Sequence, residues 1–290
     1  MLFFRVTRSA KSDNFSAFHG SSKPGNRSFG RFARPLLEVY FPGCIQLLLK
    51  VKSLAVAEIF RYCKGFRLSY SYFCVLDQKY KRGVTRRLFS QEKSNLVSAI
   101  QMVALNDLFP FIRNGFVGTV TPFFTDREHG VRYLQGTNIH AGKITDDTVY
   151  YVTEDFNAKH SKNILKRDDI LVVQSGHVGE CAVVGKEYEG ANCHALIIMS
   201  NGGHCVSDYV AQYINSEAGN KQIASITTGN TIRHILASAI ADLVIPIPSL
   251  EDQKRVAHLL SLYDDRIAKA EQLLSELETK RKGLLQQLFI

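Results

Sequence analysis

The C-terminal segment, residues 250–290, constrains the fold more than any other part of the chain. Its apolar side chains recur at alternating steps of four and three residues, the spacing of the two core positions of a heptad repeat. Nine of ten core positions are apolar and Arg281 is the exception. The nine are Val256, Leu260, Tyr263, Ile267, Ala270, Leu274, Leu277, Leu284 and Leu288.

This spacing predicts one long, coiled-coil-forming helix over residues 250–290, about 60 Å in length at 1.5 Å per residue. Such a helix outreaches a single domain of ordinary size. We therefore expect a partner helix, supplied by a second copy of the chain in a homodimer. The alternative is an amphipathic helix that packs only on its own domain.

A strand-rich segment, residues 103–249, precedes the helix. Short runs of Val, Ile, Tyr and Phe alternate there with turn residues and predict strands. The runs are 130–134, 148–152, 169–174, 181–185 and 195–199. Residues 207–218 have helical spacing, with Ser207 as the expected N-cap. We expect an α+β fold: a compact, strand-rich domain followed by the long helix.

The junction between the domain and the long helix is marked by prolines. Residues 243–248 form a short apolar run with Pro246 and Pro248, which prevent the strand from continuing. Ser249 and Asp252 then stand at the spacing of a capping box, with Asp in place of the usual Glu. The long helix is therefore expected to begin directly after Ser249.

Charge is distributed unevenly along the chain. Residues 1–100 contain 18 Lys and Arg against 5 Asp and Glu, whereas residues 101–290 contain 18 against 22. A basic surplus favours a polyanionic partner, but here it lies outside the predicted domain. Residues 1–75 show no sustained period of two or 3.6, so they stay an uninterpreted basic region, either a disordered arm or a remnant, without an assigned function.

The cysteines and the hydropathy indicate a compartment. The six cysteines form no C-x-x-C pair, which is typical of free thiols in a reducing environment, so we expect a cytoplasmic protein. The most apolar stretch, residues 44–60, is interrupted by Lys50, Lys52 and Glu58. It does not suit a bilayer, and we expect no membrane partner.

An internal repeat connects the two ends of the predicted domain. Residues 81–89, KRGVTRRLF, align with residues 281–289, RKGLLQQLF, at an offset of 200, with the Gly, Leu and Phe identical and the basic pair kept. Residues 76–102 are therefore expected to contain the end of a second, equivalent helix. The domain would then be bracketed by the ends of two such helices.

These motifs together resemble the DNA specificity subunit of type I restriction-modification systems. The Pro-x-Pro strand and the Leu-Glu-Asp-Gln turn leading into the long helix carry the resemblance most specifically. The shorter segments that resemble the family are 105–108, 112–116, 133–139, 142–144, 168–172, 175–179, 227–234, 260–267 and 282–289. The resemblance covers about residues 76–290. The family's subunits usually carry two recognition domains and two conserved helices, whereas this chain has one intact domain and one intact helix.

The resemblance implies a non-catalytic subunit that reads one half of a bipartite target in double-stranded DNA. Residues 103–249 would be the target-recognition domain, and residues 250–290 the spacer and dimerisation helix. The expected partners are type I modification (methyltransferase) subunits, with restriction subunits as further partners. No cofactor is expected in this chain, because S-adenosylmethionine, ATP and magnesium would belong to those partners. The chain would be either an active half-subunit or a truncated relic.

Candidate DNA-contact residues are polar side chains in the predicted loops, because such groups hydrogen-bond base edges while Lys and Arg bind phosphates. For each one alone, a solvated loop side chain is an equally good interpretation. The candidates are Asn114, Thr119, Gln135, Asn138, His140, Lys143, Ser175, His177, Thr228, Asn230 and Arg233.

The sequence contains no motif for catalysis. It has no Asn-Pro-Pro-Tyr or Asp-Pro-Pro-Tyr stretch, no G-x-G-x-x-G loop and no ATP-binding P-loop. The spacing of His177, Cys181, Cys193, His194, His204 and Cys205 fits no common zinc pattern, so we expect no metal site. Two competing interpretations stay open: a β-rich interaction module with a coiled-coil tail and no DNA role, and a hydrolase that would need a bound metal or a low-pKa thiol.

Overall fold

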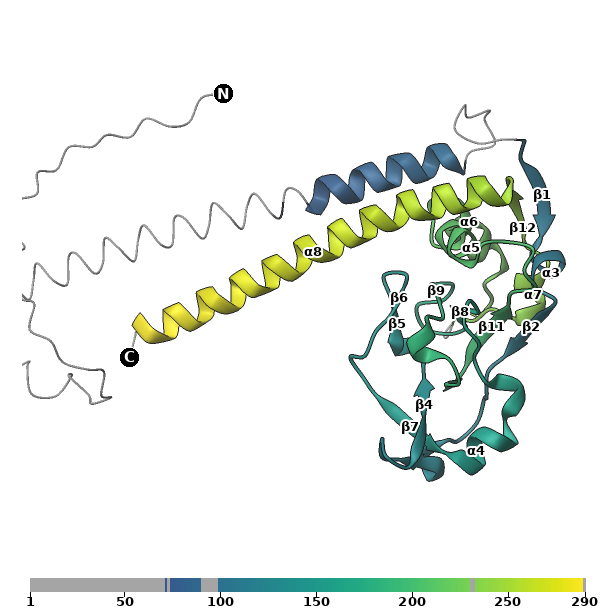
Figure 1. Ribbon diagram of the computed structural model, residues 1–290, viewed down its shortest axis with the longest axis horizontal. Coiled ribbons are helices and arrows are strands. Elements are labelled where there is room, and N and C mark those ends of the chain that lie inside the picture. Colours follow the sequence, from purple (N-terminus) through teal and green to yellow (C-terminus); the bar gives the residue numbers. More distant parts are fainter. Residues whose placement is uncertain (1–70, 72–73, 90–98, 230–232, 289–290) are drawn as a thin grey trace, which may run out of the picture. The chain divides into compact units, whose positions relative to one another are not determined.

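The computed structural model describes residues 71, 74–89, 99–229 and 233–288, all of which belong to one compact unit, residues 63–290. Most of the uninterpreted basic region, residues 90–98, Asn230 and Phe289 lie outside the described residues. Figure 1 shows a mixed domain of short strands and helices from which the long helix α8 (Leu250–Leu288) extends. The expected α+β class is confirmed.

The domain is built around two four-stranded sheets. The first has the order β2-β11-β8-β9 and is antiparallel throughout. The second has the order β10-β4-β7-β3. The strands of the first sheet are β2 (Phe111–Asn114), β8 (Ile170–Val173), β9 (Cys181–Val183) and β11 (Leu196–Ser200). Those of the second are β3 (Phe124–Thr125), β4 (Gly130–Leu134), β7 (Tyr150–Thr153) and β10 (Asn192–Cys193).

The central strands of the first sheet hold the core. Every residue of β8, Ile-Leu-Val-Val, is buried, as are the first four residues of β11, because helices or loops cover both faces of this sheet. One face packs against the cluster that includes Ile170, Val172 and Ile197, and the other against the cluster that includes Leu171, Val173 and Ile198. The predicted strands around these residues are present.

Two further two-stranded ribbons complete the domain. β5 (Ile139–His140) and β6 (Lys143–Ile144) form a hairpin. β1 (Gln101–Ala104) pairs with β12 (Val244–Ile247) in antiparallel register, Gln101 opposite Ile247. This second ribbon joins the beginning of the domain to its end. The expected domain start at residue 103 falls inside β1.

The helices of the domain are short. They are α3 (Leu105–Leu108), α4 (Glu154–Lys159), α5 (Ser207–Ile214), α6 (Glu217–Ile226) and α7 (Ala237–Ala241). Four 3-10 turns accompany them: η1 (Thr121–Phe123), η2 (Gly136–Asn138), η3 (Ser161–Asn163) and η4 (Lys186–Tyr188).

The helix expected over 207–218 is in fact interrupted. Ser216 starts a new helix, because its Oγ accepts a hydrogen bond from the backbone N of Gly219 at 3.2 Å. A Cβ at Gly219 would lie 2.2 Å from the carbonyl oxygen of Tyr213, so the close approach of α6 to α5 requires glycine there. The predicted cap was also wrong: Ser207 is the first helical residue, and its Oγ donates to the carbonyl of Asp168 at 2.6 Å.

The long helix begins where the sequence predicts. The Oγ of Ser249 accepts a hydrogen bond from the backbone N of Asp252 at 3.2 Å and donates to the Asp252 carboxylate at 3.0 Å. This local cap satisfies a backbone N–H that the first turn would otherwise leave without a partner. α8 then continues for 39 residues.

A second helix, residues 74–88, runs antiparallel to α8, and we call it the upstream helix. Figure 1 shows the two side by side. Asp77 accepts from Arg266 at 2.9 Å, and Lys81 lies 2.5 Å from Asp264. The partner expected for the first half of the apolar seam therefore comes from the same chain. The upstream helix ends before Phe89, so the 76–102 segment is only partly helical among its described residues.

The beginning of α8 is anchored in the domain core. Val256, Ala257 and Leu260 are buried in the same cluster as Leu88 and Phe89 of the upstream segment. Toward the other end of the seam Leu284 is 39% exposed. None of the described helices is long and apolar enough to cross a membrane.

Candidate nucleic-acid interface

Several of the predicted contact residues lie near one end of the first sheet, where β2 and β8 both end. Both β2 and β8 pair antiparallel with β11, so they run in the same direction and end at the same edge. Asn114 ends β2, and Ser175 follows β8. Both side chains are exposed. Thr119, in the loop after β2, is exposed as well.

The β5–β6 hairpin presents two further candidates. His140 pairs with Lys143 across a two-residue turn, and both side chains are exposed. The turn residues Ala141 and Gly142 have φ values of 50° and 77°, as a tight hairpin turn with two left-handed positions requires. The hairpin therefore has a fixed short tip rather than a long loop.

A glycine turn after β8 lies against this hairpin. His177 in the turn places its Nε2 3.0 Å from the carbonyl oxygen of Ile139 in β5. A Cβ at Gly179 would lie 2.3 Å from the Ile223 side chain, and its φ of 90° is left-handed, so both space and backbone favour glycine. The turn is thereby fixed between the hairpin and α6.

The loop before α7 lies next to the glycine turn after β8. Thr228 and His234 exchange two backbone hydrogen bonds of 2.9 Å, and His234 also bridges to Ser175. Thr228 and Arg233 are exposed, whereas Asn230 lies outside the described residues. A segment more than fifty residues after the glycine turn is thus brought next to it.

Six predicted residues are therefore gathered on one side of the domain, and we call them the recognition surface. They are His140, Lys143, Ser175, His177, Thr228 and Arg233. A cleft of about 600 Å³ borders this surface: His177 and Arg233 of the six line it, together with Gly142 and, from the helices, Lys81, Gln212 and Asp264. Polar donors and acceptors at the mouth of such a cleft suit contacts to base edges and phosphates.

Asn138 does not belong to this surface, and its assignment as a DNA contact is withdrawn. Its side chain is fully buried. The Oδ1 atom accepts from the backbone N of Gln135 at 2.9 Å, and Nδ2 donates to the carbonyls of Thr145 and Thr148 at 3.0 and 2.7 Å. The amide thus holds the loop after β4 in shape. Gln135 itself is half-buried at the start of η2.

Replacing Asn138 with alanine is expected to lower the free energy of unfolding by about 2–3 kcal/mol, because a fully buried side chain loses three hydrogen bonds to half-buried backbone partners. Urea denaturation of the Asn138→Ala and Thr137→Ala variants provides the measurement. Thr137 is the exposed neighbour and serves as the control. An unchanged stability for Asn138→Ala would contradict this structural role.

The sequence interpretation missed the helical side of the cleft. Gln212 on α5, Asn215 directly after it and Asn220 on α6 line this cleft. Asn215 also clamps β9, because its amide donates to the carbonyl of Cys181 at 2.8 Å and accepts from its backbone N at 3.1 Å. These three amide side chains were the signal in the sequence that could have identified this side of the cleft, but the helical segments were interpreted only as structural support.

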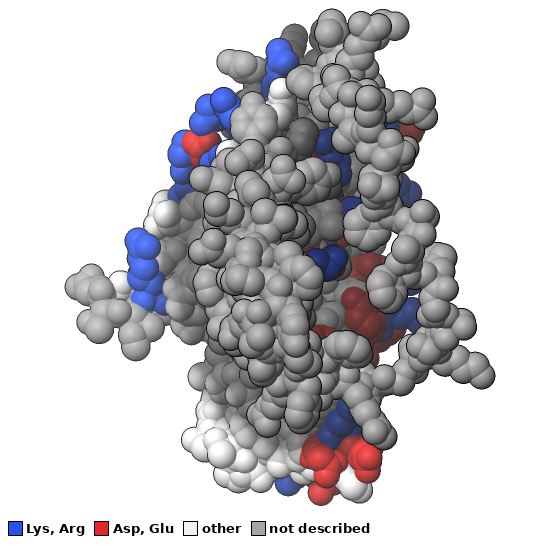
Figure 2. Space-filling model, turned by 90° about the vertical axis from the view of Figure 1, so that its left-hand side faces the viewer, with Lys and Arg blue, Asp and Glu red and all other residues white. Residues whose placement is uncertain are grey.

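Opposite charges are interspersed around the cleft. Lys143 lies 3.4 Å from Asp265, with both side chains more than half exposed, and Lys81 lies 2.5 Å from Asp264. Figure 2, which shows the left-hand side of Figure 1, displays Lys and Arg together with Asp and Glu on its described part. Two cations beside the cleft, Lys81 and Lys143, are therefore each paired with a carboxylate of α8.

The His/Cys set does not form a reactive centre among the described residues. Burial raises the pKa of the Cys193 and Cys205 thiols to about 12 and also raises that of Cys181. Burial lowers the pKa of His194. No group of three or more His, Cys, Asp or Glu within the described ranges is placed to hold a metal ion. The low-pKa thiol that a hydrolase would need is not provided by these three cysteines.

Comparison with known proteins identifies the family. Residues 98–279 match the family model described as type I restriction modification DNA specificity domain. The match covers more than half of the chain, so the chain belongs to this family, and the resemblance seen in the sequence is confirmed.

Individual relatives agree with this assignment. The StySPI specificity subunit of Salmonella potsdam is 29% identical over 181 residues, which cover 55% of this chain and 37% of the relative. The EcoKI specificity subunit of Escherichia coli K12 is 27% identical over 180 residues, again 55% and 37%. The chain thus spans well under half the length of these curated relatives.

Solved structures share the fold. The type I system S subunit from M. genitalium aligns with a TM-score of 0.55 at 15% identity, over 81% of this chain and 59% of that one. A chain from a structure of type I system assembly and conformational transition aligns with a TM-score of 0.59 at 15% identity, over 83% and 56%. The arrangement of domain and long helices is therefore that of type I specificity subunits.

Proposed function

We propose that this chain is a DNA-recognition subunit of a type I restriction-modification complex, and that it reads one half of a bipartite target. The observation that carries the proposal is the recognition surface: residues from three separate segments meet on one side of a domain that lies within the matched family region. Each bidentate contact to a base would contribute about 1–3 kcal/mol of discrimination.

The long helix supports a spacing role. α8 is fixed to the domain core at Leu260 and extends beyond it, so it holds a second reading domain at a set distance. That second domain would come from another copy of the chain in a homodimer. The helices also provide the assembly surface for modification subunits, and restriction subunits join through them. The complex would act in the cytoplasm.

Catalysis would lie in the partners. In this proposal the modification subunits bring S-adenosylmethionine, and the restriction subunits bring ATP and magnesium. This chain contributes recognition and geometry, and no reaction step is assigned to its residues. The alternative of a β-rich interaction module without a DNA role is not favoured, because the family match covers the whole strand-rich domain.

The test is co-expression with a type I modification subunit, followed by mapping of methylated adenines across the host DNA with and without this chain. We expect new methylation at a two-part motif with a fixed gap, and a palindromic motif would show that a homodimer is the working form. Co-purification without any new methylation would contradict the reading role and leave only a scaffold.

A further inference from the structure

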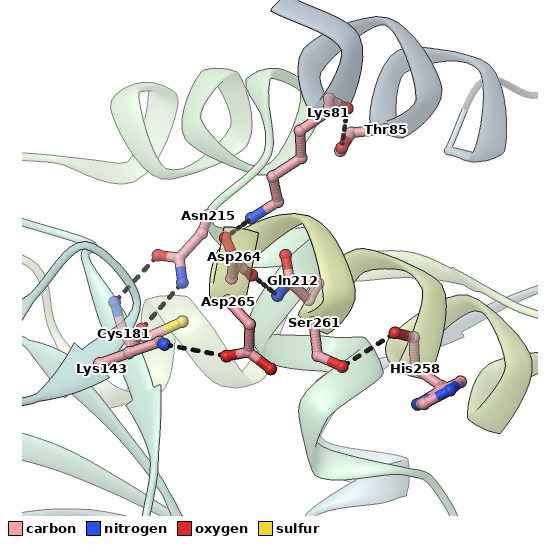
Figure 3. A network of polar contacts seen from close by, with 10 residues as sticks. All are labelled: Lys81, Thr85, Lys143, Cys181, Gln212, Asn215, His258, Ser261, Asp264 and Asp265. Carbon is pink, nitrogen blue, oxygen red and sulfur yellow. Dashed lines mark hydrogen bonds and ion pairs between the residues drawn. The ribbon is translucent and has the colours of Figure 1, made fainter. Parts of the chain in front are cut away.

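The domain and the two helices meet at a single carboxylate, that of Asp264 on α8. Its Oδ1 lies 2.5 Å from the Nζ of Lys81 on the upstream helix, and its Oδ2 accepts a hydrogen bond from the Nε2 of Gln212 on α5 at 2.7 Å. Figure 3 shows Lys81 and Gln212 converging on Asp264 from two different elements. One side chain thus connects three elements that are far apart in sequence.

This contact is shielded from solvent. The side chains of Lys81 and Asp264 are 23% and 20% exposed. In the ion pair of Arg86 with Glu217, by contrast, both side chains are more than half exposed. A shielded charge pair is screened less by water and salt than an exposed one, so its geometry is held more strongly.

Asp264 contacts the domain far along α8 from the point where the helix begins. The first attachment of α8 to the domain is Gln253, whose Oε1 accepts from the backbone N of Val206 at 2.8 Å and whose Nε2 donates to the carbonyl of Pro248 at 2.9 Å. Asp264 lies eleven residues further, about 16 Å along the helix. The core contacts of Val256, Ala257 and Leu260 lie between these two residues, and Asp265 beside Asp264 lies 3.4 Å from Lys143 of β6. Contacts spread over this length of α8 fix its angle to the domain, and Asp264 lies near their far end.

The same carboxylate borders the recognition surface. Lys81, Gln212 and Asp264 line the cleft whose other wall carries His177 and Arg233. A change in the angle of the helices would therefore change the width of this cleft and the direction in which the recognition surface faces.

We propose that Asp264 is a positioning residue that fixes the recognition domain against the helices and thereby sets the gap between the two half-sites. The second part of this inference rests on the proposed function. The first part concerns the geometry of the chain alone, so the two parts are tested separately.

The geometry is tested by electron–electron double resonance on the full-length chain. Nitroxides are attached at Lys159→Cys in α4 and Lys280→Cys in α8, both exposed positions, after Cys44 and Cys63 are replaced by serine. The four described cysteines are buried. We expect one narrow distance distribution for the parent and a distribution at least about twice as wide for Asp264→Asn. An unchanged width would overturn the proposal.

Two variants separate positioning from a general loss of structure. Glu276→Gln removes an exposed carboxylate from the same helix and is expected to keep the narrow distribution. Lys81→Asp is expected to widen it, and the double variant Lys81→Asp with Asp264→Lys to narrow it again, since the Gln212 amide can accept from a lysine. A double variant as wide as the singles would contradict positioning by this pair.

The functional part is tested by methylation of plasmid targets whose gap is one base pair longer or shorter than in the natural motif. With Asp264→Asn, the ratio of methylation at the natural gap to that at altered gaps is expected to fall at least about fivefold. An unchanged ratio, or equal loss at every gap, would overturn the gap-setting role. If the parent methylates nothing, the proposed function fails, while the distance measurement still decides the positioning role.

Discussion

Replacing Leu260 with alanine lowers the free energy of unfolding by about 3–5 kcal/mol, because the leucine is fully buried and the cavity cannot close. Leu260 lies in the core cluster that joins α8 to the domain, together with Val256 and Tyr209. Folded domains are stable by only about 5–15 kcal/mol, so the loss is a large fraction of the total.

Leu262→Ala is the matched control for this measurement. Leu262 stands two residues further on the same helix and is 48% exposed, so the same truncation there is expected to cost less than about 1 kcal/mol. Urea denaturation followed by circular dichroism compares the two variants under identical conditions. Equal destabilisation by both changes would mean that α8 is not anchored through Leu260, and that the assignment of its buried face is wrong.

The same helix shows what the sequence could predict and what it could not. Heptad spacing and the Ser249–Asp252 cap are local features, and they predicted the existence and the beginning of α8. The period shows only that one face is apolar, not what covers it. The upstream helix of the same chain covers part of this face and pairs with α8 through Asp77 and Lys81. That pairing depends on the tertiary fold, which a local sequence pattern does not reveal.

The recognition surface was predictable in part for a similar reason. Exposed loop residues such as His177 and Arg233 were found because Gly, Thr and Asn mark loops in the sequence. Asn138 is also a polar residue beside Gly and Thr, yet its side chain points inward and hydrogen-bonds three backbone groups. Side-chain direction within a tight turn is set by the backbone path, which residue type alone does not determine.

The break between α5 and α6 is a third case. Helical spacing continues through residues 207–218, so periodicity alone predicted one helix. Ser216 followed by Gly219 was the missed signal, since a serine cap and a glycine at a close approach together start a new helix. Asn215, which lies at that break, and Asn220 of α6 both line the cleft, so the wrong helix boundary falls within the candidate site.

Removal of the two cations of the recognition surface is expected to weaken DNA binding strongly and in two different ways. Arg233→Ala should cost about 1–3 kcal/mol, or about 5- to 150-fold in affinity, if the guanidinium binds a base edge. Lys143→Ala should reduce the slope of log affinity against log salt by about 0.9, because one phosphate contact and its released counterion are lost. Both side chains are exposed; Arg233 lines the cleft, and Lys143 lines a neighbouring cleft that also includes Gly142 and Asp264.

The measurement is fluorescence anisotropy of a labelled duplex that carries the methylated motif, titrated with the assembled complex at several salt concentrations. Lys159→Ala is the matched control: Lys159 is an exposed cation on α4, away from the cleft-lining residues, and its removal is expected to change affinity less than about twofold. If Arg233→Ala and Lys143→Ala behave like this control, the recognition surface is not the DNA interface. The exposed residues Asn114 and Thr119, which do not line the cleft, would then be the next positions to substitute.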